Sequence, residues 1–274
     1  MKPILIQLSS KIEEFTDYLK DLNRSPNTIK QYNYALNRIL SAEDSEKFIR
    51  EHSENMMIRA TWRRYLYYQK NIGKISSDEL LNKLERYPLP LKKGGIEKHN
   101  WYPKEKWDEI LRGLSSRPAK MAGYIQLQFG LRIGELANLT VDDIDFNNMR
   151  IHVQFKGDWK PKGRKRRSIP MTRRHARTLK RWIDNIPSTV QHKRVIWSKH
   201  GKTVSIRTVQ GWYQKANIKS HDLRRSFAKV LYYNSENDLY FVSRILGHSN
   251  INTTIRYLGL ESEEVQEKFE KAMS

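Results

Sequence analysis

Gly130-Leu131-Arg132-Ile133-Gly134-Glu135-Leu136 is the stretch from which the fold and chemistry of this chain can be worked out. An arginine between two large apolar residues must either extend to solvent or pair with a buried anion, because a buried guanidinium without a partner is very costly. Glu135 is the natural local partner, and an ion pair with it would hold the Arg132 guanidinium in a fixed position. The stretch therefore predicts a helix over about 132–139 that presents a preorganised cation.

A second stretch, His221-Asp222-Leu223-Arg224, predicts the start of another helix. Ser220 is expected to be its N-cap, so that His221 and Arg224 project from one face of the first turn, where backbone amides also favour an anion. The apolar residues of this helix leave that edge at the rim of the core. Taken alone, the pattern also fits an exposed basic helix end.

Two further stretches complete the set. Leu246-Gly247-His248 predicts the end of a helix, with Gly247 as a left-handed cap and His248 in the turn beyond it. Tyr257 follows nine residues after His248, on a new short helix. Attack on a DNA phosphodiester puts negative charge on the non-bridging oxygens, and guanidinium forks bind such oxygens bidentately. Two arginines, Arg132 and Arg224, around one tyrosine hydroxyl therefore suggest phosphoryl transfer.

The composition favours a polyanionic partner. Lys and Arg number 51 against 30 Asp and Glu, which gives a formal charge of +21. No apolar run reaches the roughly 20 residues of a membrane-spanning helix, and the start of the chain is too short for a signal peptide. We therefore expect nucleic acid as the partner, and no membrane. The absence of cysteine excludes disulfides, thiolate nucleophiles and Cys-ligated zinc, and it fits a cytoplasmic protein.

A chain of 274 residues predicts two domains. Residues 1–87 have the apolar stripes of a small helical bundle. Residues 88–99 contain prolines and adjacent glycines without periodicity, which indicates a linker. Its Lys92 and Lys93 either contact phosphates or are simply solvated. Residues 100–274 form the second predicted domain.

The second half predicts a mainly helical fold with one small antiparallel β-sheet. Residues 149–155 alternate as a half-buried strand should, and residues 167–170 supply the returning strand, which ends at a proline. The intervening loop is strongly basic, and we expect most of its cations to grip phosphates. Helical patterns cover about 107–111, 119–129, 132–139, 174–183, 206–216, 221–233 and 238–246.

Together these stretches resemble the catalytic domain of the tyrosine recombinase, or phage integrase, family. That family has an arginine in a Gly-Leu-Arg-x-x-Glu-Leu context, a His-x-x-Arg box that opens a helix, and Leu-Gly-His followed nine residues later by tyrosine. Each element is present in order within residues 130–257. The resemblance covers about residues 100–265. The N-terminal helical part, residues 1–87, agrees with the family's helical core-binding domain in size and position, without an equally specific motif.

The resemblance implies a site-specific DNA recombinase. Tyr257 would attack the scissile phosphate, form a 3′-phosphotyrosyl link and free a 5′-hydroxyl, while Arg132 and Arg224 would clamp the non-bridging oxygens. His221 would act in proton transfer or phosphate positioning, and His248 would hydrogen-bond the phosphate. Glu135 would support the geometry. No metal or other cofactor would be needed, because the covalent ester conserves the bond energy.

The family also uses a lysine on the hairpin loop as general acid. It commonly begins a Lys-Gly-x-Lys-x-Arg-x-x-Pro run, which residues 162–170 match with Arg167 at the sixth position. This match favours Lys162. The loop is long, however, so Lys165 and, less directly, Lys160 stay open as alternatives. The remaining loop cations are expected to bind DNA, and the full set of expected DNA contacts is Lys92, Lys93, Lys156, Lys160, Arg164 and Lys165.

Three functions fit the sequence to different degrees. The family resemblance favours strand exchange by a homo-tetramer on paired sites of double-stranded DNA, with a monomer or weak dimer free in solution. A type IB topoisomerase-like enzyme shares the tyrosine, arginines and histidine but relaxes supercoils as a monomer. A catalytically silent DNA-binding protein would keep the fold without the chemistry. The sequence does not distinguish integration, excision, dimer resolution and transposition.

Overall fold

The computed structural model of the chain describes residues 2–89, 100–154, 166–198, 200–259, 270 and 273. The chain divides into two compact units, Met1–Gly95 and Ile96–Ser274. No helix among the described residues is long and apolar enough to cross a lipid bilayer.

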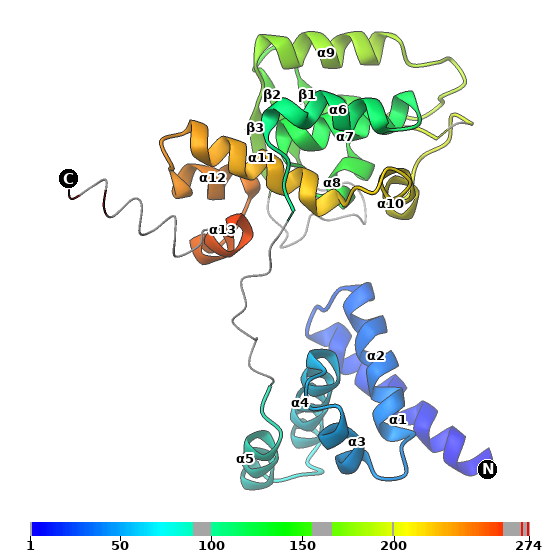
Figure 1. Ribbon diagram of the computed structural model, residues 1–274. Helices are drawn as coiled ribbons and strands as arrows, with labels where there is room; N and C mark the ends of the chain where they lie inside the picture. The colour runs from blue at the N-terminus through cyan, green and yellow to red at the C-terminus, as the bar shows by residue number, and fades with distance from the viewer. Residues whose placement is uncertain are drawn as a thin grey trace. The chain divides into compact units, whose positions relative to one another are not determined.

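The first unit is a bundle of helices, as the sequence predicts (Figure 1). Its helices are α1 (Lys2–Asp21), α2 (Pro26–Leu40), α3 (Ser45–Glu51), α4 (Met56–Asn71) and α5 (Ser77–Arg86). Helix α2 starts at a proline in its first turn, and the Ser25 hydroxyl accepts a hydrogen bond from the backbone N–H of Thr28. The apolar stripes of these helices meet in a core that includes Phe15, Leu19, Leu36, Ile39, Trp62, Tyr65 and Leu66.

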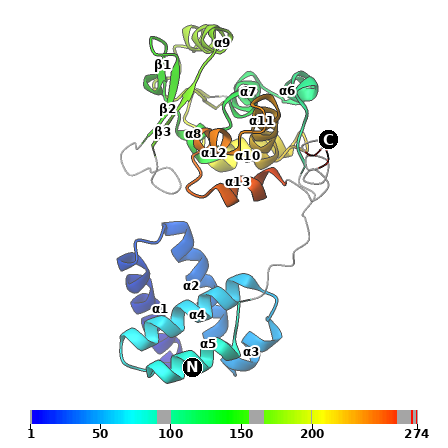
Figure 2. The same ribbon diagram turned by 90° about the vertical axis from the view of Figure 1, so that its left-hand side faces the viewer.

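The second unit is also mainly helical. Its helices are α6 (Trp107–Gly113), α7 (Arg117–Phe129), α8 (Ile133–Asn138), α9 (Arg173–Asp184), α10 (Ile206–Gln214), α11 (Ser220–Asn234), α12 (Leu239–Leu246) and α13 (Ile251–Leu258). Helices α7 and α11 pack against each other and carry much of the buried apolar surface. Within this unit, α9 lies at one end and α13 at the opposite end in both views (Figures 1 and 2).

The small sheet consists of β1 (Ile144–Asp145), β2 (Arg150–Val153) and β3 (Arg167–Pro170), all antiparallel and in that order. Ile151 pairs with Ile169 and both are buried, whereas the opposite face carries His152 and Ser168, which hydrogen-bond each other at 2.8 Å. The prediction of a mainly helical chain with one small antiparallel sheet is confirmed. Strand β1 was not predicted, since two residues are too few to show alternation.

The register of the hairpin fixes the position of one charged residue. Val153 is opposite Arg167. Because side chains two apart on a strand lie on the same face, Arg167 shares the buried face with Ile169. The sheet therefore directs a guanidinium from β3 toward the interior of the unit, where α8 and the end of α12 lie.

Candidate active site

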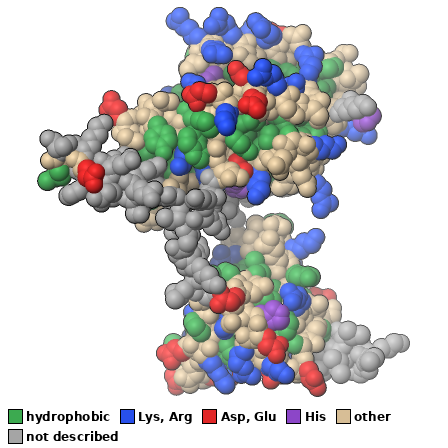
Figure 3. Space-filling view, in the orientation of Figure 1, with side chains coloured by type: hydrophobic (Ala, Val, Ile, Leu, Met, Phe, Trp, Pro, Cys, Tyr) green, Lys and Arg blue, Asp and Glu red, His purple; other side chains and the backbone are tan. Residues whose placement is uncertain are grey.

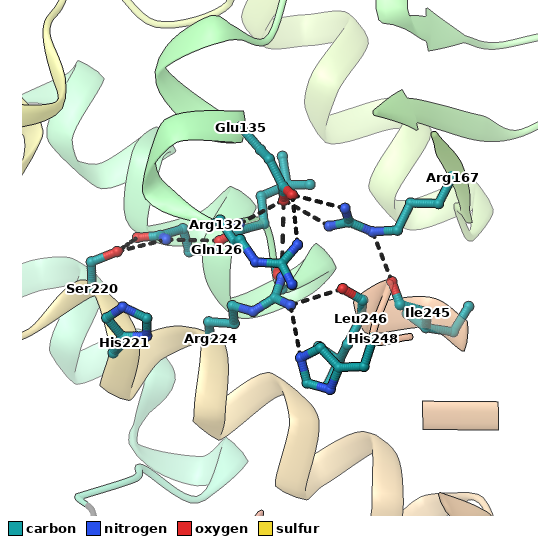
Figure 4. Close-up of polar contacts among 12 residues, drawn as sticks. Gln126, Arg132, Glu135, Arg167, Ser220, His221, Arg224, Ile245, Leu246 and His248 are labelled. Atoms are coloured by element: carbon teal, nitrogen blue, oxygen red, sulfur yellow. Dashed lines mark hydrogen bonds and ion pairs between the residues drawn. The ribbon is translucent and has the colours of Figure 1, made fainter. Parts of the chain in front are cut away.

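Glu135 is the centre of a cluster of buried charges at the start of α8. The residue is 3% exposed, and each carboxylate oxygen accepts two hydrogen bonds (Figure 4). Oε1 accepts from Arg132 Nη1 at 2.9 Å and from Arg167 Nη1 at 2.8 Å. Oε2 accepts from the backbone N–H of Arg132 at 2.8 Å and from Arg167 Nη2 at 2.7 Å. The expected ion pair between Arg132 and Glu135 is therefore present, and a second arginine shares the same carboxylate.

The protonation state of Glu135 follows from these contacts. Burial alone would raise the pKa of the carboxyl group. The hydrogen bonds and charge of Arg167, with Arg224 and Arg132 nearby, outweigh burial and lower the pKa to about 2. Glu135 is therefore ionised across the neutral range.

A tight turn between α7 and α8 fixes the backbone at Arg132. Gly130 ends α7 in the left-handed conformation, with φ 59°, and Phe227 packs so closely that a Cβ at this position would lie 2.2 Å from its ring. The amide of Gln126 donates to the carbonyl oxygen of Leu131 at 2.9 Å and fixes the next peptide of the turn. Arg132 itself leaves 23% of its side chain exposed, so its guanidinium can still meet a ligand.

Arg224 approaches the same carboxylate from α11. The residue is 2% exposed, and its Nη1 lies 3.9 Å from Glu135 Oε2. Its hydrogen bonds go instead to the carbonyl oxygens of Gly130 and of Leu246, the latter at 2.8 Å. Burial, and then the positive charge of Arg132, lower the pKa of Arg224 to about 10, which still leaves it protonated at pH 7. The sequence placed this residue at the rim of the core, but the structure buries it.

His248 lies in the turn after α12, where Gly247 takes the expected left-handed cap conformation with φ 69°. Its Nε2 is 3.5 Å from Arg224 Nη2, and its Nδ1 is 2.9 Å from the hydroxyl of Thr254, a fully buried residue on α13. Burial, and then the charges of Arg224 and Arg132, lower the pKa of His248 to about 4. The imidazole is therefore neutral at pH 7. It carries one N–H. Because a guanidinium can only donate, Nε2 accepts from Arg224 in this arrangement, and the N–H on Nδ1 donates to the Thr254 hydroxyl.

Tyr257 closes the cluster from α13. Its ring centroid is 5.9 Å from Arg224 Cζ and 5.1 Å from Arg225 Cζ, and the ring meets the His248 imidazole edge to face at 5.6 Å. The hydroxyl donates to the carbonyl oxygen of His221 at 3.3 Å. Burial raises the pKa of Tyr257, and the charge of Arg224 offsets this only in part. The phenol is therefore protonated at neutral pH.

His221 is also at the site, but in a different setting from the two arginines. His221 is exposed at the start of α11, whereas Arg224, one turn later, is buried. The expected capping by Ser220 is wrong, because α11 begins at Ser220 itself after Lys219, without a side-chain cap. The Ser220 hydroxyl instead exchanges hydrogen bonds with the buried amide of Gln126, at 2.8 and 3.1 Å. This pairing joins α11 to α7, as Figure 4 shows.

The lysines and the loop arginine predicted to touch DNA or act as general acid all lie outside the described residues. They are Lys92, Lys93, Lys156, Lys160, Lys162, Arg164 and Lys165. The choice among Lys162, Lys165 and Lys160 as general acid therefore stays a prediction.

Sequence reasoning missed two residues that the structure places in the cluster. Arg167 entered the sequence analysis only as one position of the pattern over residues 162–170, yet it forms a bidentate ion pair with Glu135. The signal was available, because a residue two before buried Ile169 on the same strand must face inward. Thr254 had no such signal, since a threonine on a short helix ordinarily needs no partner outside it.

Comparison with known proteins identifies the group to which these features belong. The model of the phage integrase family matches residues 105–264, which is more than half of the chain and includes every residue of the cluster. The chain belongs to the phage integrase family.

Members of the family are similar to this chain over nearly its whole length. The tyrosine recombinase XerA of Pyrococcus horikoshii is 27% identical over 295 aligned residues, which cover 96% of this chain and 94% of that protein. Among solved structures, the Tn1549 transposon integrase in complex with transposon right end DNA has a TM-score of 0.74 at 17% identity, covering 96% of this chain and 99% of that one. The structure of a lambda integrase tetramer bound to a Holliday junction has a TM-score of 0.68 at 14% identity, covering 91% of this chain and 76% of that one. The two structures show that the family fold is shared.

Proposed function

We propose that this chain is a site-specific DNA recombinase that cuts and reseals strands with Tyr257 as the nucleophile. The observation that supports this best is the packing of the Tyr257 ring against Arg224 and His248, beside a carboxylate that Arg132 also contacts. Three guanidinium groups, of Arg132, Arg167 and Arg224, surround the single carboxylate of Glu135, so +3 and −1 leave a charge of +2. A cluster with surplus positive charge beside a phenol suits transfer of a phosphodiester.

The reaction follows from the ordinary chemistry of these groups. The Tyr257 oxygen attacks phosphorus, the bond from phosphorus to the 5′-oxygen breaks, and a 3′-phosphotyrosyl ester forms. The non-bridging oxygens gain charge as phosphorus becomes pentavalent, and Arg132 and Arg224 stabilise that charge. Exposed His221 takes part in removing the phenol proton or in holding the phosphate. A loop lysine, Lys162 by the family pattern, gives the leaving 5′-oxygen its proton.

Neutral His248 supplies a hydrogen bond to the phosphate rather than a charge. Its depressed pKa keeps the ring uncharged near pH 7. To donate to the phosphate, the ring takes the tautomer with the N–H on Nε2, and the Thr254 hydroxyl then donates to Nδ1. Resealing is the reverse reaction, in which the 5′-hydroxyl of a partner strand attacks the phosphotyrosyl ester. The ester stores the bond energy, so no external energy source enters the reaction.

The proposed substrate is double-stranded DNA, and the proposed active form is a homo-tetramer on two sites. The charge of +21 supports DNA, since a phosphate backbone binds basic proteins largely by releasing counterions. The solved lambda integrase tetramer on a Holliday junction is a complex of that protein, and its fold similarity supports the same assembly here. The cations of the linker and of the hairpin loop that the sequence predicts as DNA contacts are part of this proposal.

Trapping of the covalent intermediate tests the proposal. A nicked duplex taken from the DNA that flanks the gene allows the cut fragment to diffuse away, so the ester should accumulate and mass spectrometry should place it on Tyr257. Tyr257→Phe should form no adduct and bind DNA normally. Tyr240→Phe, which removes a hydroxyl from an exposed tyrosine on α12, is the matched control and should form the adduct.

The same experiment separates the other functions. An adduct on a residue other than Tyr257 would overturn the assignment. Relaxation of supercoiled plasmid by a monomer, without exchange between paired sites, would indicate a type IB topoisomerase-like enzyme. A folded wild-type chain that binds DNA but forms no adduct would indicate a catalytically silent binding protein.

A further inference from the structure

Of the three arginines around Glu135, Arg167 is the one to which the proposed reaction gives no role. Its guanidinium makes a two-pronged bond to Glu135, with Nη1 to Oε1 at 2.8 Å and Nη2 to Oε2 at 2.7 Å. Its Nε donates to the carbonyl oxygen of Ile245 at 3.0 Å. Only 8% of the side chain is exposed. All three guanidinium nitrogens of Arg167 are therefore engaged within the protein, whereas Arg132 leaves 23% of its side chain exposed.

The bonds of Arg167 determine how the charge of Glu135 is shared. A carboxylate accepts about four hydrogen bonds, and here Arg167 fills two of them while Arg132 fills the other two. Arg224 stays 3.9 Å away and bonds to backbone carbonyls instead. If the fork of Arg167 were absent, the buried carboxylate would have two empty positions beside two cations. It would draw Arg132 and Arg224 toward itself and neutralise the groups that should meet the phosphate.

Arg167 also connects three parts of the site. It lies on β3, five residues after Lys162, so it fixes the strand that follows the basic loop. Its Nε bond holds the last turn of α12, immediately before the turn that carries His248. The contact there is close, since a Cβ at Gly247 would come within 2.9 Å of Arg167 Cδ. The guanidinium of Arg167, a rigid planar group, thus links β3 to the end of α12 and to Glu135.

We propose that Arg167 is a positioning residue of the active site, which holds Glu135 in place and so leaves Arg132 and Arg224 free to bind the phosphate. The inference deepens the function proposed above. It assigns Arg167 no contact with the substrate. The bidentate fork is essential to this role, because a lysine supplies the charge from a single nitrogen and cannot reproduce two parallel bonds from separate nitrogens to the two oxygens.

The test is a cycle of variants measured by single-turnover cleavage of the nicked duplex. Arg167→Met should lower the rate about 100-fold, the usual effect of a displacement near 1 Å among reacting groups. Arg167→Lys should lose about tenfold. Adding Glu135→Gln to Arg167→Met should recover at least tenfold of the loss, because the double variant lacks the carboxylate that competes for the other arginines. Ser168→Ala, on the opposite face of β3, is the control and should match wild type.

A residue that only stabilised the fold would give a different pattern. Each variant is checked for native circular dichroism and a cooperative thermal transition, and Arg167→Lys serves if Arg167→Met does not fold. Equal or greater loss in the Glu135→Gln and Arg167→Met double variant, compared with folded Arg167→Met alone, would overturn the proposal.

A second measurement makes the result independent of the recombinase chemistry. Inorganic phosphate is titrated into the DNA-free protein by ³¹P NMR, with Arg132→Ala defining the binding that occurs elsewhere on a basic surface. Arg167→Met should weaken the specific binding at least tenfold, and Glu135→Gln should restore it in the double variant. Unchanged phosphate binding in Arg167→Met would overturn the role. If this cycle holds while the wild-type chain forms no Tyr257 adduct, the function fails and the role of Arg167 stands.

Discussion

Thr254 shows how one hydroxyl can connect the nucleophile to the group that binds the phosphate. It is fully buried on α13, one turn before Tyr257, and its oxygen is 2.9 Å from His248 Nδ1. A hydroxyl can donate or accept, so it permits either neutral tautomer of the imidazole. Docking of α13 therefore places the tyrosine and satisfies the histidine at the same time.

Thr254→Val keeps the shape of the side chain and removes this hydrogen bond. It leaves a partly buried ring nitrogen without its partner, which should lower the free energy of unfolding by about 1–2 kcal/mol in urea denaturation. Cleavage of the nicked duplex should fall as well, because His248 loses its orientation. Thr254→Ser keeps the hydroxyl and is the control. Equal cleavage by the valine and serine variants would show that the contact has no part in the reaction.

Single residues also show how much of the site the sequence could predict. The pair of Arg132 and Glu135 was predictable, because the two are three apart and an apolar context forces a charge to find a partner. The inward orientation of the Arg167 side chain was predictable from strand alternation. Its partner was not, since Glu135 is 32 positions away in the chain. Ser220 had the residue type and position of a cap. Its hydroxyl bonds to Gln126 instead, a buried amide 94 positions away that no local pattern reveals.

The turn between α7 and α8 shows why the Gly-Leu-Arg sequence begins with glycine. Gly130 has φ 59°, its carbonyl oxygen accepts a hydrogen bond from Arg224, and the ring of Phe227 from α11 occupies the space beside it. The helix end thus brings Arg132 and Arg224 together, although they come from different elements. Helix ends and strand alternation were predictable from sequence, whereas the packing of α11 on α7 that makes the glycine necessary was not.

Gly130→Ala should therefore be much more harmful than an ordinary glycine substitution. The added methyl group would lie 2.2 Å from the Phe227 ring, and the left-handed backbone disfavours any side chain. We expect the free energy of unfolding to fall by about 2–4 kcal/mol, the sum of the conformational and overpacking costs. Gly73→Ala is the matched control, because Gly73 has φ 71° but nothing within 4 Å. Similar losses in the two variants would show that the Phe227 contact is unimportant.

The whole chain separates the charge that binds DNA from the charge that does chemistry. The excess of +21 is distributed widely, and in the face shown by Figure 3 many Lys and Arg side chains lie over α9, at the far end of the second unit from α13. Around Glu135, the side chains of Arg167 and Arg224 are buried and each makes several hydrogen bonds, whereas Arg132 keeps part of its side chain exposed. The sequence predicted the polyanionic partner from the excess alone. It could not tell which cations are fixed, because fixing depends on contacts between α8, α11, α12 and β3.

Arg132→Ala tests this separation. Binding of a duplex depends on many phosphate contacts, so the dissociation constant should rise less than tenfold, and the slope of log K against log salt should change by about 0.9, the contribution of one contact. Cleavage should fall by about 100- to 1000-fold, as when one donor to a developing charge is removed. Arg177→Ala, which changes an exposed residue of α9, is the control and should cleave normally. If Arg132→Ala lost binding and cleavage by the same factor, Arg132 would bind the ground state and the transition state equally. It would then be one more phosphate contact, and the surplus charge at Glu135 would have no special part in the chemistry.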